Sequence, residues 1–162
     1  MIISILFLII TIFVFFVYGL YLREYVEVTV VFKSLRKVLE SRDLLVLKLL
    51  PDFKKKSLSE KILNLINDRN AKSKISYDDA LAADVALHNE LKKLYDVINK
   101  EKKNALQEDI FKRIILMEKR IKILRSKYTA AVAKYNMSLT IHPKVCLKIF
   151  HMKPLEMYGK KE

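Results

Sequence analysis

The strongest structural signal of the chain lies in residues 105–139, which read ALQEDIFKRIILMEKRIKILRSKYTAAVAKYNMSL. Apolar side chains recur there in alternating steps of four and three residues, a rhythm that places them on one face of an α-helix. A helix of this length extends for roughly 50 Å, longer than the average globular helix. We therefore expect one long helix with a buried seam. The seam consists of Ile110, Ile114, Met117, Ile121, Leu124, Tyr128, Ala131, Tyr135 and Leu139.

The opposite face of this predicted helix is charged. Acidic residues precede basic residues by four positions, the order that modestly stabilises a helix. We interpret this pattern as a solvated face. The pairs are Glu108–Lys112, Asp109–Arg113 and Glu118–Lys122.

Upstream, shorter periodic runs predict further helices. Ser57 and Glu60 have the spacing of a capping box and precede an apolar run. The polar residues 67–76 predict a loop, and the lysine-rich residues 99–104 predict a turn. Short connections of this kind are typical of an antiparallel bundle. The second periodic run consists of Leu81, Val85, His88, Leu91, Tyr95 and Ile98.

The first 22 residues contain no charged side chain. As a helix they would extend for roughly 33 Å, enough to cross the hydrocarbon core of a bilayer. A secretory signal peptide is the alternative, but its positive n-region and its small-residue cleavage site are not visible. Tyr18 and Tyr21 suit the aromatic belt at a membrane interface. We therefore expect a transmembrane anchor at residues 1–22.

Residues 23–50 allow two interpretations. Val26, Val28 and Val30 alternate with other residues as in a β-strand, whereas a stripe that includes Phe32 fits a helix. We favour one helix that continues out of the membrane, because a lone strand would have no partner. Pro51 should end or kink this helix.

Composition agrees with an all-α protein. The 162 residues include only 2 glycines and 3 prolines, and the formal net charge is +13. We predict an anchor at residues 1–22, a bundle of three to four long helices at residues 23–158, and a basic tail at residues 159–162. A strongly basic domain next to an anchor suggests the anionic leaflet of the lipid bilayer as its neighbour. Cys146, the single cysteine, cannot form a disulfide within the chain and is expected to be a small buried residue.

Flanking charge predicts the orientation. Basic residues, beginning with Arg23, follow the apolar stretch, whereas only the amino terminus precedes it. The positive-inside rule then places the N-terminus outside and the soluble domain in the cytoplasm of a single-pass protein of the cell membrane.

No catalytic constellation is apparent in the sequence. His88, His142 and His151 have no metal-ligand spacing with carboxylates or with Cys146. Neither a glycine-rich phosphate loop nor a nucleophile elbow occurs. We therefore expect no enzymatic activity, no cofactor, no metal and no small-molecule substrate.

The long helix and the tail after it resemble the C-terminal signature of the LemA family of bacterial membrane-anchored proteins. The resemblance is most specific from Glu118 to Tyr158, although the first of the family's two Tyr-Asn pairs reads Tyr128-Thr129 here. It implies a four-helix-like bundle behind one transmembrane helix, with no established enzymatic activity and a frequent association with membrane proteases. The matching residues, which form a candidate partner surface, are Glu118, Arg125, Tyr128, Tyr135, Asn136, Pro143 and Pro154.

Two functions of different classes follow. The first is a membrane-anchored scaffold or interaction protein whose partners are other membrane proteins, a membrane protease among the candidates. The second is a membrane-tethered nucleic-acid-binding protein, which rests on the net charge alone. The second is disfavoured, because the basic residues are scattered over several helices without a clustered arm.

Overall fold

The computed structural model is helical over all the residues that it describes except the tail segment 152–155, and the described residues contain no strand. The prediction of an all-α chain is therefore confirmed. The described residues are 2–52, 56–72, 77–100, 105–141 and 152–155. The elements are α1 (Ile2–Leu49), the 3-10 turn η1 (Leu50–Asp52), α2 (Lys56–Lys72), α3 (Tyr77–Lys100) and α4 (Ala105–Ile141).

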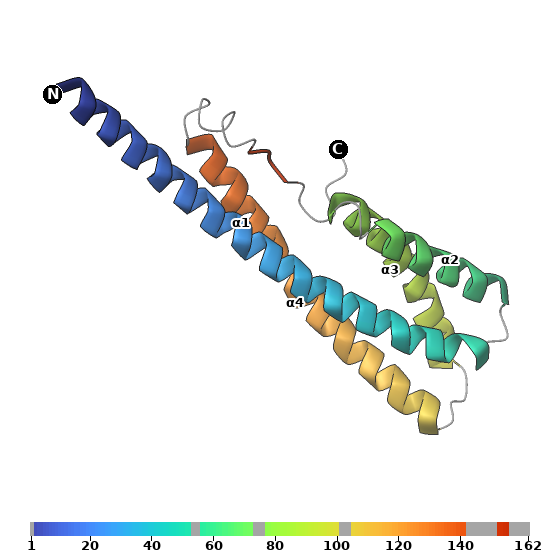
Figure 1. Cartoon of the computed structure of the whole chain (residues 1–162). Coiled ribbons are helices and arrows are strands. Elements are labelled where there is room, and N and C mark those ends of the chain that lie inside the picture. The colour runs from blue at the N-terminus through green and yellow to red at the C-terminus, as the bar shows by residue number, and fades with distance from the viewer. Residues whose placement is uncertain (1, 53–55, 73–76, 101–104, 142–151, 156–162) are drawn as a thin grey trace.

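Successive helices run in opposite directions, and the N-terminal part of α1 extends past the other helices (Figure 1). α4 packs along α1, and α2 packs on α3. The boundaries of α4 agree closely with the predicted residues 105–139, and every predicted seam residue is buried or half-buried. The step of four and three was thus a reliable guide to this helix.

α1 is one continuous helix, so the strand interpretation of residues 25–32 is wrong. The Thr29 hydroxyl donates to the Tyr25 carbonyl one helical turn away. Val28 and Phe32, four residues apart, are both buried in the core. Packing of this face outweighs the weaker helix propensity of the β-branched residues.

Pro51 lies in the 3-10 turn directly after α1. Its ring excludes a further helical hydrogen bond and restricts the residue before it. The predicted end of the first helix is therefore confirmed.

The predicted loop at residues 67–76 is wrong in its first half, since α2 continues to Lys72. Arg69 explains the difference, because its side chain is buried and pairs with Asp43 of α1. Two smaller corrections concern helix ends. Ser57 lies within the first turn of α2 and not before it, and α3 continues through Asn99 to Lys100.

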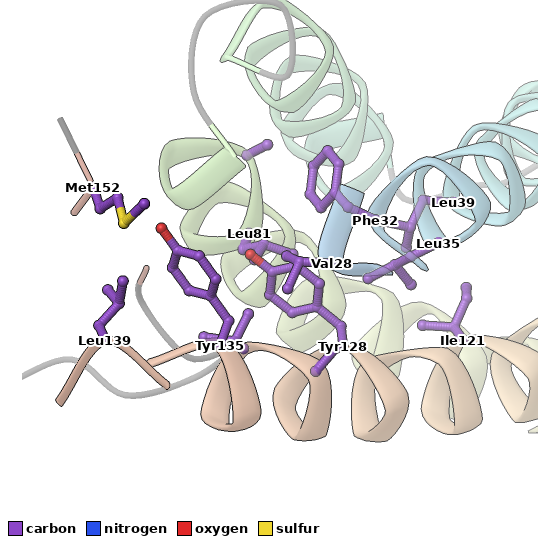
Figure 2. Packing of buried hydrophobic residues seen from close by; sticks show 13 residues of the cluster. Val28, Phe32, Leu35, Leu39, Leu81, Ile121, Tyr128, Tyr135, Leu139 and Met152 are labelled. Carbon is purple, nitrogen blue, oxygen red and sulfur yellow. The ribbon is translucent and has the colours of Figure 1, made fainter. Parts of the chain in front are cut away.

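The apolar interior divides into two clusters. In the first core cluster, Tyr128 and Tyr135 rise from α4 toward α1, and Met152 of the tail lies beside Tyr135 (Figure 2). The first core cluster consists of Val28, Phe32, Leu35, Leu39, Ala80, Leu81, Ile121, Tyr128, Ala131, Val132, Tyr135, Leu139 and Met152. The second core cluster consists of Val46, Leu49, Leu50, Ile62, Ile66, Leu87, Leu91, Leu94, Ile98, Phe111 and Ile114.

The bundle begins inside the apolar N-terminal stretch. Val17 is buried, and Tyr18 and Tyr21 pack against the first core cluster. Residues 2–16 are exposed apart from the partly covered Thr11 and Val14. Within the described residues, one helix, α1, is long and apolar enough to cross a membrane.

Candidate functional site

A network of buried charges lies where the two core clusters meet, and each of the four helices contributes to it. Its centre is Arg42 of α1, which stands on the inward face of that helix among apolar residues. The Nη2 atom of Arg42 lies 3.0 Å from Oδ1 of Asp43 and 3.1 Å from Oδ1 of Asp84. Its Nη1 atom lies 3.3 Å from Oε1 of Glu118. One guanidinium therefore links α1, α3 and α4.

Two further arginines complete this charge network. Arg69 of α2 places Nη2 2.7 Å from Oδ2 of Asp43. Arg125 of α4 pairs with Asp84. Three guanidinium groups thus face three carboxylates, so the buried charges balance. We call Arg42, Asp43, Arg69, Asp84, Glu118 and Arg125 the charge network.

Burial and pairing act against each other in this network. Burial disfavours the charged form of Arg42, but the neighbouring carboxylates outweigh it and raise the pKa of Arg42 above the ordinary arginine value. For Asp43, burial prevails over the nearby arginines and raises its pKa. Burial likewise lowers the pKa of Arg69. Ions held this way add little net stability, whereas removal of one partner is costly. The charge network is therefore suited to fixing how the four helices align with one another.

At the edge of the charge network, Glu118 also faces α3. Its Oε1 atom accepts a hydrogen bond of 3.2 Å from the Tyr95 hydroxyl, and its Oε2 atom lies 3.6 Å from Nδ1 of His88. Burial raises the pKa of Tyr95 and lowers the pKa of His88. The interpretation of Glu118 as part of a solvated face is therefore wrong, because its carboxylate turns toward Arg42 and Tyr95.

An open groove of about 530 Å³ lies beside these side chains. Two lysines, Lys119 and Lys122, line it together with the apolar Ile115. Among the described residues, no group of three His, Cys, Asp or Glu side chains is placed to hold a metal ion. His142, Cys146 and His151 lie outside the described residues.

The residues of the family-like signature divide between two places. Glu118 and Arg125 belong to the charge network. Tyr128 is fully buried, and its ring centroid lies 5.8 Å from that of Phe32. The structure thus gives these three residues internal positions. The other four residues of the set belong to the C-terminal end of α4 and to the tail.

Tyr135 and Asn136 hold the described part of the tail. The Tyr135 hydroxyl lies 2.9 Å from the carbonyl oxygen of Lys153. The Asn136 amide donates to the Leu155 carbonyl at 2.7 Å and accepts from the Leu155 amide at 2.9 Å. An asparagine inside a helix is unfavourable unless its amide group finds partners of this kind. We call Tyr135 and Asn136 the tail clamp.

The two prolines of the signature contribute differently. Pro143 lies outside the described residues; it follows the last residue of α4, Ile141, by two positions. Pro154 is exposed between the two tail residues that the clamp binds.

Sequence reasoning missed the charge network, although one signal was present. Asp84 occupies the same helical face as Leu81, Leu87 and Leu91, all of them buried. A carboxylate at such a position requires a buried cation. Arg42 lies in the same kind of position on α1, at helical spacing from the buried Leu35 and Leu39. Only the fold joins the two. Comparison of the chain with models of known families, with curated proteins and with solved structures found no match.

Proposed function

We propose that this chain is a membrane-anchored helical-bundle protein that acts as a non-catalytic scaffold at the membrane surface, in the manner that the LemA-like signature suggests. The observation that carries the proposal is the exposed apolar end of α1. Its side chains from Ile2 to Phe16 are largely uncovered; Phe7, for example, is 72 % exposed. Such a surface is costly in water and favourable in a bilayer.

The dimensions of α1 support this anchor. Residues 2–16 would extend for roughly 22 Å as a helix, and residues up to Leu22 would extend for roughly 32 Å, close to the thickness of the hydrocarbon core. The additional residues include Tyr18 and Tyr21, which pack against the bundle. In this proposal the end of the bundle meets the headgroup region, where tyrosine side chains are favoured.

The basic residues after the apolar stretch support an anionic lipid leaflet as the neighbour of the bundle and a cytoplasmic orientation of the bundle. Arg23, Lys33 and Lys37 follow the apolar stretch and are exposed on α1. They would face anionic lipid headgroups on the cytoplasmic side. The helices beyond them are tied together by the charge network, and we expect no catalytic role for them. Its proposed partners are other membrane proteins, a membrane protease among them.

Thiol labelling in intact cells tests this proposal. A Lys112→Cys substitution in a Cys146→Ser background places a thiol at an exposed position of α4. We expect the protein in the membrane fraction, resistant to carbonate extraction, with the thiol protected from an impermeant reagent until lysis. Recovery in the soluble fraction would contradict the anchor. Labelling before lysis would contradict the cytoplasmic orientation.

A further inference from the structure

The tail clamp binds main chain and not side chains. All three of its hydrogen bonds to the tail end on backbone atoms, the carbonyl oxygen of Lys153 and the carbonyl and amide groups of Leu155. The Asn136 amide group both donates to and accepts from the same residue, as a neighbouring strand would. Recognition of this kind requires an extended segment but not a particular sequence at the bonded positions.

Specificity comes instead from two apolar side chains of the tail. Met152 is buried in the first core cluster, and Leu155 packs against that cluster half-buried. Lys153 and Pro154 between them are exposed. Pro154 also favours an extended backbone at Lys153. The segment that fits is therefore apolar at its first and fourth positions and extended throughout.

The clamp has supports that do not involve the tail. The Tyr135 and Tyr21 hydroxyl oxygens lie 3.2 Å apart. The Tyr135 ring centroid lies 5.5 Å from that of Tyr21 and 6.0 Å from that of Tyr25. Tyr135 is thus positioned by α1 whether or not the tail is bound. When the side chains of a site are already in place, binding of a segment costs less conformational entropy.

We propose that Tyr135, Asn136 and the adjoining first core cluster form a peptide-docking site for an extended segment of a partner protein that is apolar at its first and fourth positions. Residues 152–155 of the chain itself are the intramolecular occupant of this site and act as a latch. A partner segment of the same pattern replaces them. The inference rests on the proposed scaffold function in that it names its docking site, but the binding itself needs no membrane.

A peptide-binding measurement on the full chain tests the site. In a Met152→Ser/Leu155→Ser variant the latch loses both apolar contacts, and the site becomes available. The probe is a fluorescein-labelled peptide of residues 150–157, FHMKPLEM, titrated in mild detergent and followed by anisotropy. Residues 152–155 belong to the same chain as the site, and such covalent attachment gives them an effective concentration at the site of order millimolar. We therefore expect a Kd of roughly 10–300 µM for the variant and at least tenfold weaker binding to the wild-type chain.

Two peptide changes test the clamp without altering the protein. N-methylation at Leu155 removes the amide that donates to Asn136 and should weaken binding at least tenfold. Serine at positions 152 and 155 should abolish binding, whereas Lys153→Glu should change the Kd less than threefold. Equal binding of the methylated peptide, or no saturation with the unmodified peptide up to about 1 mM, would overturn the proposal.

A protein variant gives a third comparison. Asn136→Leu added to the latch variant should weaken binding at least tenfold. Met137→Leu, at the neighbouring position that is 66 % exposed, should leave the Kd unchanged. A loss of binding with Met137→Leu as large as that with Asn136→Leu would contradict a specific clamp. Because the measurement is made in detergent, its failure would leave the anchor proposal to its own test.

Discussion

Arg42 of α1 and Asp84 of α3 form an ion pair at 3.1 Å in which neither side chain is exposed. The two residues lie 42 positions apart in the sequence. Their contact joins the helix pair α1 and α4 to the helix pair α2 and α3, whose close backbone contacts lie mainly within each pair.

Removal of one partner should therefore be costly. We expect Asp84→Asn to destabilise the chain by about 3–5 kcal/mol, because it leaves buried guanidinium groups without their carboxylate. Thermal or chemical unfolding followed by circular dichroism in mild detergent measures this loss. The control is Arg36→Met, which removes the exposed pair with Glu40 at 2.8 Å and should cost less than about 1 kcal/mol. Similar losses for the two variants would argue against a buried network.

The seam of α4 offers a matched pair two residues apart. Ile121 is fully buried, whereas Ile123 is 57 % exposed. Ile121→Ala should cost about 2–5 kcal/mol of unfolding free energy, because it removes buried atoms and leaves a cavity. Ile123→Ala should change stability by less than about 0.5 kcal/mol. Equal effects in the same unfolding assay would mean that the seam lies on another face.

Tyr135 combines core packing with a polar contact. Its side chain is 1 % exposed, so Tyr135→Ala should destabilise the chain by about 2–4 kcal/mol. Tyr135→Phe keeps the ring but removes the hydroxyl that reaches Tyr21 and Lys153, and it should cost about 1 kcal/mol. Melting temperatures of both variants test this order. A larger loss for Tyr135→Phe than for Tyr135→Ala would contradict it.

His88 should make stability depend on pH. Burial lowers its pKa, although Glu118 opposes this shift, and Arg125 and Lys92 reinforce it. Below a pH of about 6.5 the unfolded chain takes up a proton at this histidine more readily than the folded chain. Its contribution to stability is therefore complete above that pH and declines as the pH falls toward the folded pKa.

The measurement is a comparison of melting temperatures at pH 7.5 and pH 5.5. His88→Gln should reduce the difference that the wild-type chain shows, since glutamine does not titrate in this range. Titration of the His88 ring protons by NMR gives the folded pKa directly. A folded pKa above the unfolded histidine value would refute the assigned direction.

Local pattern was enough to predict the long helix α4 and the end of α1. The alternation of apolar residues from Ile110 to Leu139 reports one helical face, and Pro51 marks a helix end through its missing amide. Both signals act within one or two turns of chain, so no tertiary information is needed to interpret them. The absence of charged residues before Arg23 is likewise a property of the local sequence, and it was enough to predict an apolar first helix segment.

Only the tertiary structure decided the charge network, the length of α2 and the place where the tail residues 152–155 bind. Glu118 and Lys122 have the spacing of an exposed pair, yet Glu118 turns inward because Arg42, 76 positions away, is buried opposite it. α2 continues through a polar stretch of sequence because Arg69 forms a buried ion pair with Asp43 of α1. Asn136 finds its partners 19 residues later, in the tail. A charged or amide side chain carries no mark of its distant partner, since the energy of burying it depends on a group that only folding brings near.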